Sequence, residues 1–149
     1  MGDRARAALP YFALAVLCGA IGIHLALSQS GERKLERAGE ELRSGRYAEA
    51  LAELEGVDGQ GSGRAAALRG YAHIGRGQYE RAAPEFSAAV RRAPNDWVLQ
   101  RDYAIVLRTI GQRATARARM QLALSLNPRM ALPRGFRAVE RVRSSRRRR

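Results

Sequence analysis

Apolar and polar residues are arranged in two different ways along this chain of 149 residues. Residues 7–27 form an apolar run whose only polar side chains are those of Tyr11 and His24. At about 1.5 Å per residue, a helix of this length spans roughly 30 Å, which is the thickness of the hydrocarbon core of a bilayer. The run therefore predicts a transmembrane helix or signal anchor over residues 7–28, after a short basic N-tail over residues 1–6.

Beyond this run, the chain repeats a pattern of small, glycine and large apolar positions. Gly45, Gly77 and Gly111 are separated by 32 and 34 residues. The same two spacings relate two columns of small residues and one column of large apolar residues. These columns are Ala38, Gly70 and Ala104; Ala50, Ala82 and Ala116; and Leu54, Phe86 and Met120.

Each repeated position has a physical reason in a pair of packed helices. Glycine suits the left-handed conformation that ends a first helix, and small residues let two helices approach closely. Pro94 and Pro128 close the second and third units, because proline cannot continue a second helix. Pro84 lies inside one second helix, which predicts a late start or a kink there. The glycine-rich residues 59–63 predict a loose coupling between the first two pairs. We expect helix pairs over 32–44 and 47–57, 64–76 and 79–92, and 97–110 and 113–126.

A period near 34 residues with this order of residue types resembles the tetratricopeptide repeat, over roughly residues 31–130. The resemblance implies an all-α chain in which the N-terminal transmembrane helix is followed by a three-repeat α-solenoid of antiparallel helix pairs. The units are expected at residues 31–62, 63–96 and 97–130, and are called units one, two and three below. A short capping helix is expected over residues 131–142, with Phe136 and Val139 as candidates to cover the end of unit three. A disordered Arg-rich tail is expected over residues 143–149.

The resemblance also implies a concave groove lined by the first helix of each unit. Arg101 and Arg108 are seven residues apart, so they share one helix face with Ile105 between them. Because arginine offers a bidentate fork to carboxylates, this face would suit a partner with apolar and acidic groups. The lysines and asparagines of the family's carboxylate clamp are not present at the matching positions, so recognition of chaperone tails is not expected. The predicted groove residues are Arg64, Ala67, Tyr71, Ile74, Val98, Arg101, Ile105 and Arg108.

Charge adds a second candidate for binding. The net charge is +13, and all the basic residues except Lys34 are arginine. The tail could attract anionic lipid or nucleic acid through charge alone, with a steep dependence on salt. For nucleic acid the sequence offers no reading helix and no aromatic stacking platform, so this partner is not favoured. The tail arginines are Arg143, Arg146, Arg147, Arg148 and Arg149.

The residues needed for catalysis or metal binding are scarce. Cys18 is the only cysteine and lies in the apolar run, and His24 and His73 are the only histidines. This excludes an intrachain disulfide and a multi-cysteine zinc site, and no glycine-rich loop ends in the residues that bind phosphate. We therefore expect no enzymatic activity, no metal and no cofactor.

These observations favour a non-enzymatic scaffold or assembly adaptor, tethered by a single membrane span, that binds a protein or peptide partner in its groove. We expect the repeats on the extracytoplasmic side. One alternative is a secreted or periplasmic repeat protein, because residues 26–28 resemble a cleavage site for a signal peptide. Another is a basic protein that binds anionic lipid or nucleic acid through its tail.

Overall fold

The computed structural model describes residues 30–57 and 62–136, and within these ranges the chain is entirely helices and turns, without a strand. The expected all-α class is therefore confirmed for this part. None of the helices in these ranges has the length and apolar character that a membrane crossing requires. The transmembrane helix expected over residues 7–28 and the tail over residues 143–149 lie outside the described residues.

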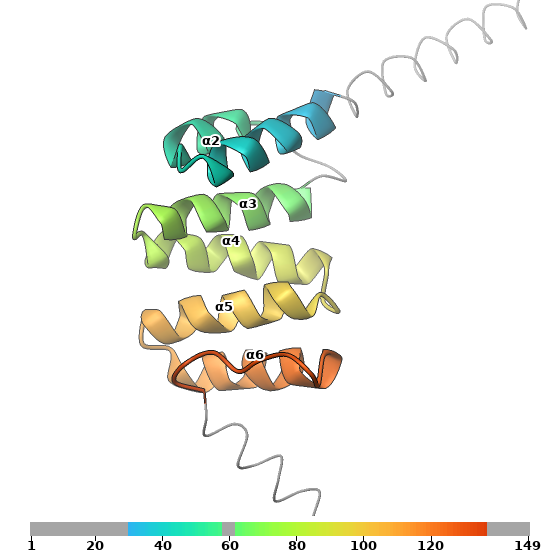
Figure 1. Ribbon diagram of the computed structural model, residues 1–149, viewed down its shortest axis with the longest axis vertical. Coiled ribbons are helices and arrows are strands. Elements are labelled where there is room, and N and C mark those ends of the chain that lie inside the picture. Colours follow the sequence, from blue (N-terminus) through green and yellow to red (C-terminus); the bar gives the residue numbers. More distant parts are fainter. Residues whose placement is uncertain (1–29, 58–61, 137–149) are drawn as a thin grey trace, which may run out of the picture.

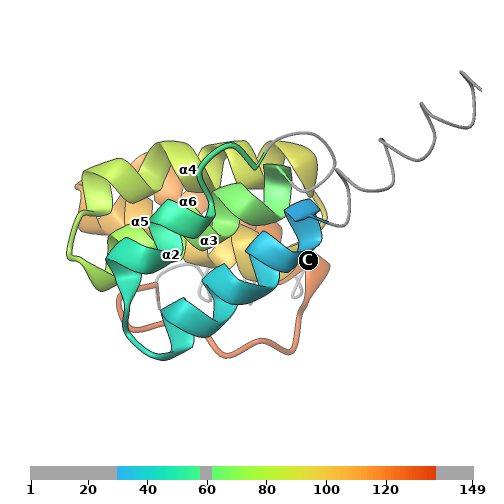
Figure 2. The same cartoon turned by 90° about the horizontal axis from the view of Figure 1, so that it is seen from above.

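The helices stack in chain order, each roughly antiparallel to the next (Figure 1). The first helices of the units lie on one side of the stack and α4 and α6 on the other (Figure 2). This packing is compatible with an α-solenoid. The helices are residues 30–43, then α2 (Tyr47–Glu53), α3 (Ser62–Gly75), α4 (Tyr79–Arg92), α5 (Trp97–Thr109) and α6 (Arg113–Leu126).

These bounds agree with the expected pairs to within two residues, with the exception of α2. That helix ends at Glu53, whereas the repeat pattern predicted a helix up to residue 57. The reason is Gly56, whose φ of +68° places it in the left-handed region, so the last turn closes early. The second helix of unit one is consequently only seven residues long.

The glycines of the repeat end the first helices as expected. Gly45, Gly77 and Gly111 have φ values of +74°, +70° and +84°. In unit two, the amides of Gly77 and Gln78 donate to the carbonyls of Ile74 and His73, both at 2.8 Å. These are the bonds that satisfy the last carbonyls of a helix ended by a left-handed glycine.

The small columns lie at the closest helix contacts. Ala82, Ala104 and Ala116 are each at most 1% exposed. At Gly70, a Cβ atom would lie 2.8 Å from Cε2 of Phe86, so a larger residue would collide with that ring. The columns of small residues therefore mark the positions at which two packed helices approach each other most closely.

The first turn of α4 forms before Pro84, so the predicted late start is wrong. The helix begins at Tyr79, because the amide of Ala82 already donates to the carbonyl of Gln78 at 3.0 Å. Pro84 lies exposed within the helix, where its missing N–H removes a single helical hydrogen bond.

The buried residues form three clusters instead of one continuous core. The largest joins α4, α5 and α6, and a small second one joins Ala66, Ala67 and Ala89 of unit two. The third belongs to unit one and reaches α3 through Ala65. Unit one is further attached by Arg69, whose Nη1 donates to the carbonyl of Leu54 at 3.1 Å.

After α6 the chain turns back and runs across that helix as an irregular segment over residues 127–136, called the return segment below (Figure 1). It lies on the same side of the stack as the helix over residues 30–43 (Figure 2). Residues 131–136 are not helical, although a capping helix was expected from residue 131, and the remainder of that range lies outside the described residues. Pro133 and the left-handed Gly135, with φ of +93°, explain the interruption.

Candidate functional site

The predicted groove residues lie on α3 and α5, on the side of the stack that we call the first-helix face. Two of them, Tyr71 of α3 and Arg101 of α5, are brought together by a third residue, Asp102. The Tyr71 hydroxyl donates to Asp102 Oδ2 at 2.6 Å, and Arg101 Nε donates to Asp102 Oδ1 at 2.7 Å. One carboxylate therefore fixes a side chain from each of two units.

The surroundings of this carboxylate affect the protonation of both donors. The side chain of Asp102 is 14% exposed, so its charge is poorly solvated. Burial, and then the hydrogen bond to Asp102, raises the pKa of Tyr71 well above its usual value. The hydrogen bond to Asp102 also raises the pKa of Arg101. Tyr71 is therefore a neutral donor and Arg101 a permanent cation.

Arg101 is held on two sides but keeps a free edge. Its guanidinium carbon lies 5.3 Å from the centre of the Trp97 ring, and Nε is bound to Asp102. The side chain is 30% exposed, and its two Nη groups have no partner among the described residues. Because the guanidinium is fixed before any partner arrives, it would lose little conformational freedom on binding an anion.

Four apolar groove residues lie beside this group but contribute more to packing than the sequence suggested. Ala67 is buried, and Ile74 and Ile105 pack partly against the largest core cluster. Val98 is half-buried in the first turn of α5, where its amide donates to Oδ1 of Asp96 at 2.9 Å. Val98 and Ile105 lie three residues before and four residues after Arg101, so these two share its helix face.

The two remaining predicted residues are engaged elsewhere. Arg64 forms an ion pair of 2.5 Å with Glu32 of unit one, with both side chains well exposed. Arg108 stacks on Phe136 of the return segment, with its guanidinium carbon 5.3 Å from the ring centre. Of the eight predicted residues, those around Arg101 therefore form a central group. Arg64 is engaged by Glu32 and Arg108 by Phe136.

Asp102 and the return segment's contact with Arg108 are the features that the sequence reasoning missed. Asp102 is the only acidic residue of α5 and directly follows Arg101, which is the one sequence signal that pointed to it. Phe136 was expected to cover unit three, but from a helix and without Arg108. Neither contact has a counterpart in the repeat columns.

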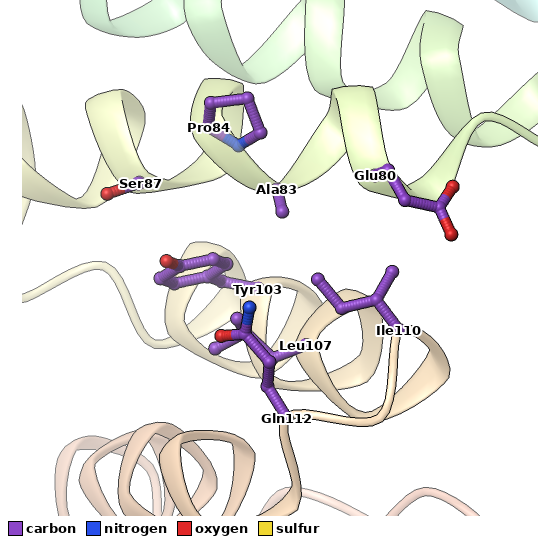
Figure 3. A pocket seen from close by; sticks show the side chains of 8 residues that line it. All are labelled: Glu80, Ala83, Pro84, Ser87, Tyr103, Leu107, Ile110 and Gln112. Atoms are coloured by element: carbon purple, nitrogen blue, oxygen red, sulfur yellow. The ribbon is translucent and has the colours of Figure 1, made fainter.

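A groove that includes none of the predicted residues lies between α4 and α5. Figure 3 shows the rings of Tyr103 and Pro84 on facing walls, with Ala83 between them. This groove has a volume of about 510 Å³, and the guanidinium carbon of Arg119 lies 5.4 Å from the centre of the Tyr103 ring. Tyr103 and Leu107 are buried, so these two side chains offer little surface to a ligand in the groove. Its lining residues are Glu80, Ala83, Pro84, Ser87, Tyr103, Leu107, Ile110 and Gln112.

Among the described residues, no three His, Cys, Asp or Glu side chains are close enough to hold a metal ion. In the groove between α4 and α5, Ser87 accepts a hydrogen bond from Arg91 at 2.9 Å, and no described hydrogen bond joins its hydroxyl to a base. Comparison with known proteins finds no match, either among protein-family models or among curated sequences. The site with the most specific geometry is therefore the group of Tyr71, Asp102, Arg101 and Trp97.

Proposed function

We propose that this chain is a non-enzymatic adaptor with tetratricopeptide-like repeats, tethered to a membrane by its N-terminal helix. It binds a protein or peptide partner on the first-helix face, with Arg101 as the central contact. The observation that carries the proposal is the fixed guanidinium of Arg101, bound to Asp102 at 2.7 Å and stacked on Trp97.

The chemistry of this face favours an extended segment with an acidic residue. The free Nη edge of Arg101 matches a carboxylate, and charge-assisted bonds of this kind are about twice as strong as neutral ones. Val98 and Ile105 are half-buried at one turn on either side of Arg101, so they offer apolar contact to the neighbouring residues of the partner. The combination gives selectivity that charge alone does not provide.

The proposal is tested by photo-crosslinking of the full chain in its native membrane. A benzoylphenylalanine replaces Val98 on the first-helix face or, as the control, Thr115 on the exposed side of α6. The face position should give a defined adduct that Arg101→Ala abolishes and Arg117→Ala preserves, because Arg117 is exposed on α6 without a described partner. Equal adducts from both positions, or an adduct indifferent to Arg101, would refute a site on α3 and α5.

The tether is tested separately. Its basis is the apolar run over residues 7–27, which contains no charged residue. After alkaline carbonate extraction, the chain should stay in the membrane pellet. Recovery of a soluble chain that begins at Gln29 would replace the tether with the secreted or periplasmic alternative.

One observation favours a second candidate function, which is binding to anionic lipid. Residues 103–136 contain six arginines and no acidic residue, and the tail beyond them adds further arginines. Basic residues near a bilayer contribute about 1 kcal/mol each to binding of anionic lipid. Binding to vesicles with and without phosphatidylserine should then fall steeply with salt and fall further when residues 143–149 are removed.

A further inference from the structure

The far end of the first-helix face already holds an aromatic side chain. Phe136 is 3% exposed and belongs to the same buried cluster as Leu107, Met120 and Leu124. Arg108 covers the ring at 5.3 Å. Gly135 lies against the guanidinium of Arg108 so closely that a Cβ atom at this position would overlap it. The apolar floor and the cation above it together form a site for one aromatic ring, and Gly135 allows the return segment to lie close to that cation.

The segment that delivers this ring is weakly attached to the helices. Among the described residues, the backbone of residues 129–136 forms no hydrogen bond to a helix, because all of its bonds stay within the return segment. The amides of Arg129 and Met130 donate to Asn127, at 3.2 and 3.3 Å, and the amide of Phe136 donates to the carbonyl of Pro133 at 3.2 Å. A segment held mainly by side chains opens more readily than a helix.

The site lies in line with Arg101. Seven residues separate Arg101 from Arg108, which is about 10 Å along a helix. An extended peptide covers that distance with about three residues. A partner bound at Arg101 would therefore reach the position of Phe136 with a side chain three residues from its acidic residue.

We propose that the position under Arg108 is an aromatic-binding subsite, and that Phe136 is its resident occupant, which an aromatic side chain of the partner displaces. This inference rests on the proposed function and adds the partner's chemistry, namely an acidic residue and an aromatic residue about three positions apart. Displacement exchanges one ring for another on the same floor. The apolar contact is restored, and only the remaining contacts of the return segment are lost.

The subsite is tested with the full chain in neutral-lipid nanodiscs. The probe is a labelled peptide with the sequence of residues 132–136, acetyl-Leu-Pro-Arg-Gly-Phe-amide, and the control peptide has alanine in place of phenylalanine. Phe136→Ala empties the subsite, so this variant should bind the probe about tenfold more tightly than it binds the control peptide. The native chain should bind the probe about tenfold more weakly than the variant. Adding Arg108→Ala to the variant should weaken probe binding about threefold.

A second variant covers the case in which Phe136→Ala disturbs the helices. In Gly135→Ala, a residue with φ of +93° is strained and its Cβ atom would overlap Arg108, so the return segment should open while Phe136 and Arg108 are both kept. This variant should bind the probe more tightly than the native chain does, with an unchanged far-ultraviolet circular dichroism spectrum. Equal binding of probe and control peptide by both variants would overturn the subsite. So would hydrogen exchange at residues 129–136 as slow as that of α5 and α6, because the segment would then be a permanent cap.

Different experimental results would refute the aromatic subsite and the proposed function. Crosslinking to the partner should be lost in Arg101→Ala and increased in Phe136→Ala. Loss in the first variant without a gain in the second would refute the aromatic subsite alone. An adduct that is insensitive to Arg101 would refute the proposed function.

Discussion

The hydroxyl of Tyr71 on α3 donates a hydrogen bond of 2.6 Å to Oδ2 of Asp102 on α5. The two residues belong to different repeat units, so the bond ties unit two to unit three on the side where we place the partner. It also fixes the carboxylate that holds Arg101. Stability and the proposed binding would therefore depend on the same pair, and the two effects can be separated by substitution.

Removing the hydroxyl should destabilise the fold while leaving the ring in place. Tyr71→Phe should lower the free energy of unfolding by about 1–2 kcal/mol, because a part-buried bond to a charged acceptor is lost. Tyr79→Phe is the matched control, since its hydroxyl has no described hydrogen-bond partner. Urea unfolding of both variants measures the difference. Equal losses would mean that the bond to Asp102 contributes nothing specific.

The same bond should give the stability a dependence on alkaline pH. Burial and then Asp102 raise the pKa of Tyr71 above its ordinary 10.0, so the folded state favours the protonated hydroxyl. This contribution is complete below about pH 10 and is lost as the pH rises through the raised pKa. The difference in unfolding free energy between the native chain and Tyr71→Phe should therefore be constant from about pH 8 to about pH 10 and should shrink above about pH 10, towards pH 11. A difference that stays constant up to about pH 11 would contradict the assignment.

Overpacking should identify the closest helix contact of unit three. Ala116 is 1% exposed, whereas Ala118, two residues later on α6, is exposed. Ala116→Leu should cost about 1–3 kcal/mol, and Ala118→Leu should change stability by less than about 0.5 kcal/mol. Thermal unfolding of the two variants provides the comparison. Similar midpoints would show that the column of small residues is not a packing column.

Two helical glycines should respond to alanine with opposite signs. Gly70→Ala brings a Cβ atom to 2.8 Å from the Phe86 ring, so it should destabilise the protein. At Gly39 the nearest side-chain atom to a new Cβ is Nη1 of Arg43 at 3.8 Å, which is ordinary contact. Gly39→Ala should therefore stabilise the helix over residues 30–43 by about 0.5–1 kcal/mol. In chemical denaturation, the midpoint should be lower for Gly70→Ala and higher for Gly39→Ala than for the native chain.

The helices were predictable because their limits depend on local residue types that recur. Gly77 and Gly111 end first helices through their own backbone freedom, and Ala116 lies where its spacing from Ala82 indicates. The short α2 was missed because Gly56 is a second left-handed glycine that has no counterpart in the other units. A repeat pattern predicts the features that the units share, but it does not predict a feature that is present in one unit only.

The centre of the candidate site was predictable only in part, for a related reason. Tyr71 and Arg101 followed from their places on the first helices. The role of Asp102 depends on the distance between two helices, which no pattern within one helix reports. Phe136 depends on the course of an irregular segment around Pro133 and Gly135. Contacts between units and contacts made by loops therefore required the structure.

The division of the core into separate clusters has a mechanical consequence. The described chain enters the stack at residue 30, at the end opposite α6 (Figure 1). Unit one has its own small cluster and a second helix of seven residues, and it meets the rest mainly at α3. A pulling force applied at residue 30 would load this unit before any other, and it would yield at lower tension than the cluster of α4, α5 and α6. Unit one would unfold and lengthen first, and the face around Arg101 would stay folded while the force is taken up by that extension.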